Sequence, residues 1–93
     1  MYASLSIRSA ASFAAVVDLI NDAPFTEGMQ GIEFTAEQLA GQYAAEAQIE
    51  SGYAVDEAAL EAQLEFLSEG GANFDAAAAI RYGKAFAKAA TQK

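Results

Sequence analysis

Four glutamates recur at every fourth residue in one stretch of the chain and are its clearest candidates for a chemical role. They are Glu57, Glu61, Glu65 and Glu69, and we call them the acidic ridge. Residues four apart are neighbours on a helix surface, and like charges in this arrangement repel by about 0.2–0.5 kcal/mol per pair. A sequence selected for stability alone would alternate acids with bases there. The uniform sign therefore indicates a use for the negative charge.

The first chemistry to consider for these carboxylates is metal binding or catalysis. Carboxylate oxygens bind Mg²⁺ and Ca²⁺, but nothing else in the sequence supplies the remaining ligands of a six-coordinate site. The chain has no histidine and no cysteine, which removes the commonest general base, the thiol nucleophile and most transition-metal ligands. We therefore expect a protein that is not an enzyme and has no catalytic residues, metal site or cofactor. A small carboxylate-dependent enzyme is an alternative that ranks below the two binding roles described later in this section.

The second chemistry is electrostatic attraction to a partner. The net charge is −8, and all 13 acids precede residue 81, whereas residues 81–93 carry four of the five bases. A negative body repels nucleic acid and anionic membranes, so we expect neither as a direct partner and favour a basic protein surface. No apolar run reaches the roughly 18 residues of a membrane span. Without cysteine or a convincing signal peptide, the expected location is the cytoplasm.

The element that must position the ridge is a predicted helix over residues 57–69. Asp56 is its expected N-cap, and the glycine pair after residue 69 ends it. Leu60, Leu64 and Leu67 define the predicted buried side. At 100° per residue the glutamates centre nearly opposite these leucines, so the ridge should face solvent.

Three further helices and up to three strands complete the predicted fold. Alternation predicts a strand over Tyr2–Arg8 and a brief one over Gly31–Phe34, and residues 53–55 form a third strand or a linker. The helices are expected at Ala10–Asn21, with Ser9 as N-cap, from about Ala36 to Glu50 after a Thr35–Gln38 capping box, and from Asn73 or Asp75 to about Thr91. Residues 21–31 should form a loop.

These elements predict one domain, residues 1–93, of the α+β class and rich in helix: four helices packed on a small two- or three-stranded sheet. In the last helix Ala79, Gly83 and Ala87 form a seam of small residues that permits close helix contact.

The surface around the ridge offers further candidates for partner binding. Asp56, Glu46 and Glu50 would extend the negative field if the second and third helices lie side by side. Tyr53, at the start of the ridge, is a candidate aromatic anchor, as is Phe74 beyond its end, since aromatic residues often dominate interface energies; both are also candidates for the core.

Two structural explanations of the ridge stay open. It is either an ordinary solvated face, or Arg81, Lys84 and Lys88 of the same chain lie against Glu61 or Glu65. Exposed pairs of this kind contribute only about 0–1 kcal/mol each.

The functional explanation uses the spacing of the charges. Residues four apart rise about 6 Å along a helix, and phosphates of one DNA strand rise about 3.4 Å along the axis while winding around it. A carboxylate row of this pitch can therefore occupy lysine and arginine positions that normally hold a nucleic-acid backbone. The association would be fast and sensitive to salt.

In size, charge and helical carboxylate rows, the chain resembles phage-encoded anti-CRISPR proteins and other nucleic-acid mimics. Its opening, Leu5–Ala10, which is predicted to be a strand running into a helix, also resembles the start of such small phage proteins. Such proteins share no common fold, so the resemblance transfers no functional residue. It implies a stoichiometric inhibitor, in the cytoplasm of a host cell, that docks on a CRISPR effector complex or another nucleic-acid-binding protein and blocks nucleic-acid access.

The basic C-terminal end departs from a pure mimic. It supports the alternative, a structural or self-assembling protein in which the acidic body of one copy pairs with the basic last helix of another, as in a homodimer.

Overall fold

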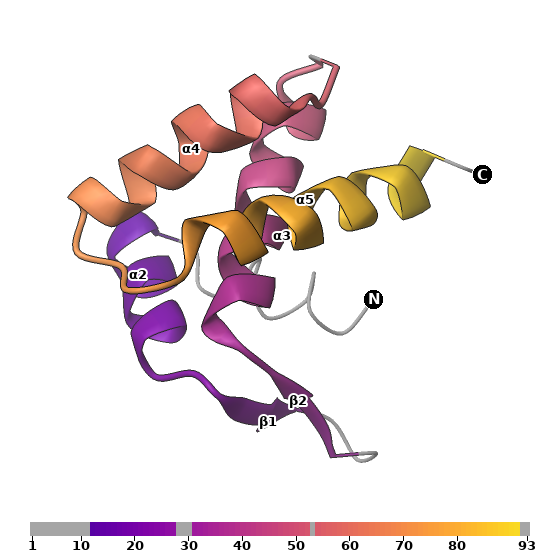
Figure 1. The fold of residues 1–93 in the computed structure, drawn as a ribbon. Coiled ribbons are helices and arrows are strands. Elements are labelled where there is room, and N and C mark those ends of the chain that lie inside the picture. The colour runs from indigo at the N-terminus through magenta and orange to yellow at the C-terminus, as the bar shows by residue number, and fades with distance from the viewer. Residues whose placement is uncertain (1–11, 28–30, 53, 92–93) are drawn as a thin grey trace.

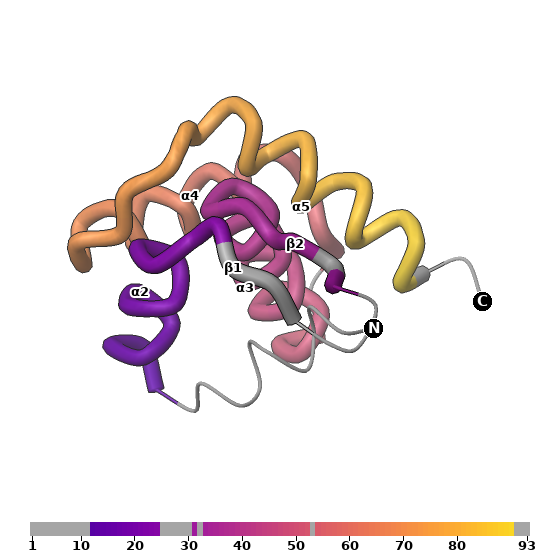
Figure 2. Tube along the Cα trace, turned by 90° about the horizontal axis from the view of Figure 1, so that it is seen from below, coloured from indigo at the N-terminus to yellow at the C-terminus, as the bar shows by residue number. Residues whose placement is uncertain are grey.

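The central element of the fold is a helix, α3, whose small side chains allow other helices to approach closely. The computed structural model describes residues 12–27, 31–52 and 54–91. The elements within these ranges are α2 (Phe13–Asn21), β1 (Phe25–Glu27), β2 (Ile32–Phe34), α3 (Ala36–Glu50), α4 (Glu57–Glu69) and α5 (Ala76–Thr91). Helices α2, α4 and α5 all pack against α3, and α4 also packs against α5 (Figures 1 and 2).

The predicted packing of four helices on a sheet is wrong. Helices pack on helices, and the strands of the described residues form one short antiparallel pair, β1 with β2, in which Phe25 lies opposite Phe34. The pair sits at the lower end of the helices in Figure 1. Three-residue strands offer too little surface for four helices, and α3 supplies the buried layer instead. The predicted strand over Tyr2–Arg8 lies outside the described residues.

Two other boundaries differ from the prediction. Helix α2 begins at Phe13, and its N-cap is Ser12, whose Oγ accepts a hydrogen bond from the Ala15 N–H at 3.2 Å, so the predicted start at Ala10 is wrong. Strand β1 falls in a segment that was predicted to be a loop. Residues 54–55 form no strand, which agrees with the predicted alternative of a linker. Both segments carry weak local signals: more than one serine can cap the start of α2, and a run of two or three residues is too short to mark a strand.

The other helix starts follow their predicted caps. Thr35 and Gln38 form the capping box of α3: the Gln38 N–H donates to Thr35 Oγ1 at 3.2 Å and the Thr35 N–H donates to Gln38 Oε1 at 2.8 Å. Helix α5 is tied to α3 at its start, where the Asp75 N–H donates to the Glu37 carboxylate at 2.8 Å. This contact fixes the start of α5 relative to α3.

Helices α3 and α5 cross with their backbones nearly in contact. Ala79 is fully buried and Ala87 is 8% exposed, so the predicted seam of small residues is confirmed as a helix contact. Its partner on α3 is Gly41, since a Cβ at this position would meet the backbone of Ala79 and lie 2.7 Å from the Gly83 nitrogen. Ala79 and Gly83 of the seam thus pack within the chain, against α3.

One buried side chain of α3 carries an amide nitrogen without a hydrogen-bond partner among the described residues. Gln42 is 4% exposed, and its Nε2 has no hydrogen-bond partner within the described residues. A buried polar group without a partner costs about 1–3 kcal/mol. We expect Gln42→Met to raise the free energy of unfolding by about 1 kcal/mol in urea denaturation, because the unpaired amide is removed at similar volume.

The matched control for this prediction is Gln38→Met in the same helix. It removes the half of the capping box that Gln38 supplies, so it should lower stability by up to about 1 kcal/mol. A Gln42→Met variant that loses as much stability as Gln38→Met would contradict the assignment of Gln42 as an unpaired group.

Candidate functional site

Helix α4 holds the acidic ridge outward. All four ridge glutamates are exposed, and the opposite side of the helix is anchored by Leu60, Leu64 and Leu67, which are 0%, 2% and 0% exposed. The prediction of a solvent-facing row on a helix of residues 57–69 is therefore confirmed. Twelve residues of helix separate its two ends, a rise of about 18 Å.

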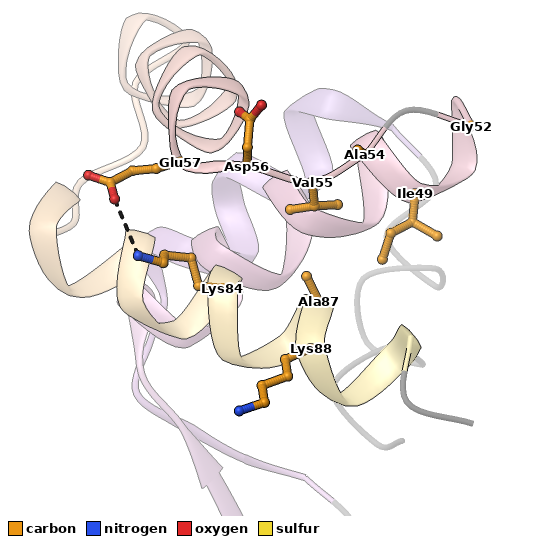
Figure 3. A pocket seen from close by; sticks show the side chains of 9 residues that line it. All are labelled: Ile49, Gly52, Ala54, Val55, Asp56, Glu57, Lys84, Ala87 and Lys88. Carbon is orange, nitrogen blue, oxygen red and sulfur yellow. Dashed lines mark hydrogen bonds and ion pairs between the residues drawn. The ribbon is translucent and has the colours of Figure 1, made fainter.

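The chain neutralises one end of the ridge. Lys84 Nζ of α5 lies 3.2 Å from Glu57 Oε1, with the two side chains 56% and 63% exposed (Figure 3). Within the described ranges no ion pair reaches Glu61, Glu65 or Glu69, so pairing with the last helix occurs at the first glutamate and stops there. An exposed pair of this kind contributes about 0–1 kcal/mol. The other three carboxylates, which we call the open ridge, face solvent.

The predicted extensions of the ridge have different outcomes. Asp56 and Glu50 are exposed, and α3 packs against α4 as the extension required. Glu46 is 8% exposed, so its assignment to the binding surface is corrected: α3 is covered on most sides, and position 46 falls on a covered one. Tyr53 lies outside the described residues.

Asp56 also has a structural role that can be measured. Its Oδ1 accepts a hydrogen bond from the Ala59 N–H at 2.7 Å and so caps α4. We expect Asp56→Ala to lower the free energy of unfolding by about 1 kcal/mol, because an N-cap aspartate is lost. Asp56→Asn keeps the cap without the charge and should stay within about 0.5 kcal/mol of the wild type in the same thermal or urea titration. Equal losses in both variants would mean that the charge, not the cap, stabilises the helix.

A hollow of ≈ 230 Å³ lies beside the open ridge, between α4 and the start of α5. We call it the ridge groove. Its lining combines apolar side chains with two open-ridge carboxylates and contains no lysine or arginine. The lining residues are Glu61, Leu64, Glu65, Ser68, Phe74, Ala76 and Ile80. Phe74, predicted as either an anchor or a core residue, is half-buried and contributes to this lining. The negative charge of the ridge therefore sits over an apolar surface.

A second hollow, of ≈ 550 Å³, lies at the other end of α4 (Figure 3). Acids and lysines line it in equal number around an apolar floor: Ile49, Gly52, Ala54, Val55, Asp56, Glu57, Lys84, Ala87 and Lys88. Asp56 is engaged in its cap and Glu57 with Lys84. This hollow has no net preference for an ion of either sign, so the ridge groove is the better continuation of the acidic surface.

Exposed aromatic residues were missed by the sequence reasoning. Phe66 of α4 is 54% exposed, and its ring centroid lies 4.8 Å from that of Phe13 in α2. Tyr82 of α5 is 43% exposed. The helical phase of Phe66 relative to the buried leucines was the signal that could have placed it on the flank of α4.

The described part of the chain defines a helix-rich protein with an acidic, solvent-facing helix. Within it, no three histidine, cysteine, aspartate or glutamate side chains gather closely enough to hold a metal ion. None of its helices combines the length and apolar character that crossing a membrane requires. Comparison with protein-family models, curated proteins and solved structures gave no match.

Proposed function

We propose that this chain is a non-enzymatic inhibitor that docks its open ridge on a basic, nucleic-acid-binding surface of another protein and blocks nucleic-acid access. The observation that carries the proposal is the set of three exposed carboxylates, Glu61, Glu65 and Glu69, none of which has an ion pair with another described residue. A partner surface built to hold phosphates has cations that such a row can neutralise.

The spacing supports this reading over a merely solvated face. The three carboxylates follow one helix at intervals of about 6 Å, and the leucines behind them are buried, so the helix backbone under the row is anchored. Binding then has to order only the glutamate side chains, at about 0.5–1.5 kcal/mol each, and not the backbone that carries them. The resemblance to small phage inhibitors names a CRISPR effector complex, in the cytoplasm of a host cell, as the partner class to test first.

The testing experiment is displacement of labelled DNA from purified CRISPR effector complexes, followed by fluorescence anisotropy. The wild-type protein should release the DNA at near-stoichiometric amounts. The ridge-reversed variant, Glu61→Lys, Glu65→Lys and Glu69→Lys, should release none, because its ridge repels the basic surface. Circular dichroism checks that this variant keeps its helices.

The matched control carries the same change of net charge elsewhere. Asp18, Asp22 and Glu33 are exposed acids outside α4, and their reversal to lysine should leave displacement within about threefold of the wild type. If both triple variants lose displacement equally, net charge rather than the ridge is responsible. If the folded ridge-reversed variant still displaces DNA, the proposal fails.

A further inference from the structure

The ridge groove adds a shape requirement to the charge of the ridge. Its lining includes three apolar side chains, Leu64, Phe74 and Ile80, which we call its floor, and the carboxylates of Glu61 and Glu65. Phe74 and Ile80 are half-buried, so part of this apolar floor remains accessible. An occupant must therefore meet two different demands within one small hollow.

Two simple kinds of occupant fail to meet both demands. A small inorganic cation would satisfy the carboxylates but would leave the apolar floor in contact with water. A purely apolar side chain would cover the floor and would also remove water from two carboxylates without giving them a partner, which is costly. An amphipathic cation, with an apolar stem and a charged end, meets both demands.

We infer that the ridge groove receives an arginine side chain of the partner, with its methylene stem on Leu64, Phe74 and Ile80 and its guanidinium between Glu61 and Glu65. This inference rests on the proposed function and names the partner group that the ridge engages. Side chains four apart on a helix have Cβ atoms about 5–6 Å apart. The planar guanidinium has five N–H donors and can donate to carboxylates on both sides.

The size of the groove and its charges agree with this occupant. A water molecule takes up about 30 Å³ of liquid, and the seven bonded heavy atoms of an arginine side chain take up less space than seven waters, so ≈ 230 Å³ leaves room for them. Arg81, the base next to Ile80 in the chain, forms no ion pair with Glu61 or Glu65. The two carboxylates are therefore open to an arginine from outside.

The direct test is an NMR titration of the full chain with acetyl-arginine amide at millimolar concentration. The methyl signals of Leu64, Ala76 and Ile80 should shift in a saturable way, and those of Leu19 on α2 should not. Acetyl-citrulline amide, which has the same stem without the charge, should cause at most one tenth of the shift. Equal shifts with citrulline, or no saturable shift with arginine, would overturn the inference, and equal shifts with acetyl-lysine amide would overturn the assignment to arginine.

A variant whose groove is filled by a larger side chain tests this inference separately from the proposed function. Ala76 is exposed and lines the groove, so Ala76→Leu should occupy the hollow without changing any charge. It should abolish the arginine-induced shifts and weaken DNA displacement at least tenfold. Ala85→Leu, at an exposed position of the same helix outside the groove, should change neither.

Different outcomes identify which idea has failed. If Ala76→Leu displaces DNA as well as the wild type while the ridge-reversed variant does not, the ridge binds the partner and the arginine inference is wrong. If the wild type itself displaces no DNA but binds acetyl-arginine amide in the groove, the groove inference survives as a property of the surface and the proposed inhibition fails.

Discussion

Replacing Gly41 with alanine is expected to lower the free energy of unfolding by about 3 kcal/mol, toward the upper end of overpacking costs. The added Cβ would meet the Ala79 carbonyl oxygen and lie 2.7 Å from the Gly83 nitrogen. Both are backbone atoms of α5, so relief requires the whole helix to move away from α3. The melting temperature should fall by about 10–25 °C in a domain of this size.

The sign of the effect makes the prediction specific. In an unhindered helix, alanine is favoured over glycine by about 1 kcal/mol, so propensity alone predicts stabilisation. Gly52→Ala is the matched control: its Cβ would meet nothing within 4 Å, and its φ of +82° costs an alanine about 1 kcal/mol. A Gly41→Ala variant as stable as Gly52→Ala would mean that the close crossing of α3 and α5 does not exist in solution.

This crossing also shows how far the sequence predicted the fold. Ala79, Gly83 and Ala87 were identified as a seam because small residues at helical spacing have a local signature. Gly41 was not identified as the other half, because a single glycine in an alanine-rich helix has no pattern of its own. Which helix covers which face depends on contacts between distant segments.

Local signals predicted the site better than the sheet. The N-cap at Asp56, the capping box of Thr35 and Gln38 and the buried leucines of α4 depend on neighbours within one or two turns, and the structure has them all. The observed strand pair joins Phe25–Glu27 to Ile32–Phe34, and only the second of these strands lies in a segment that was predicted to be a strand. A three-residue strand carries too little alternation to be recognised, and a larger sheet under the helices was wrong.

The ridge was predicted correctly and its extension at Glu46 was not, because only the ridge depends on local contacts. The ridge glutamates are exposed because they lie opposite leucines of their own helix. Glu46 is buried because other elements cover α3 almost all round, which its own sequence does not reveal. Likewise the ridge groove combines α4 with residues 74–80, so no single segment predicts it.

The largest functional effect is expected in the rate of association. Replacing Glu61, Glu65 and Glu69 with glutamine should slow binding to the basic partner by about 10- to 1000-fold at low salt, because electrostatic steering is lost. For the wild type, the association rate should fall steeply as salt rises from about 20 to 500 mM, over which the Debye length shrinks from roughly 20 Å to below 5 Å. For the glutamine variant, the rate should change little with salt. Stopped-flow fluorescence measures both.

Glutamine keeps the size and helical preference of glutamate, so this variant separates charge from shape more cleanly than lysine does. The matched control, Asp18→Asn, Asp22→Asn and Glu33→Gln, removes the same charge from exposed positions outside α4. It should retain most of the wild-type rate and salt dependence, because steering falls off with distance from the docking surface. Equal slowing in both variants would assign steering to the net charge of −8, and the ridge would then be one solvated face among others.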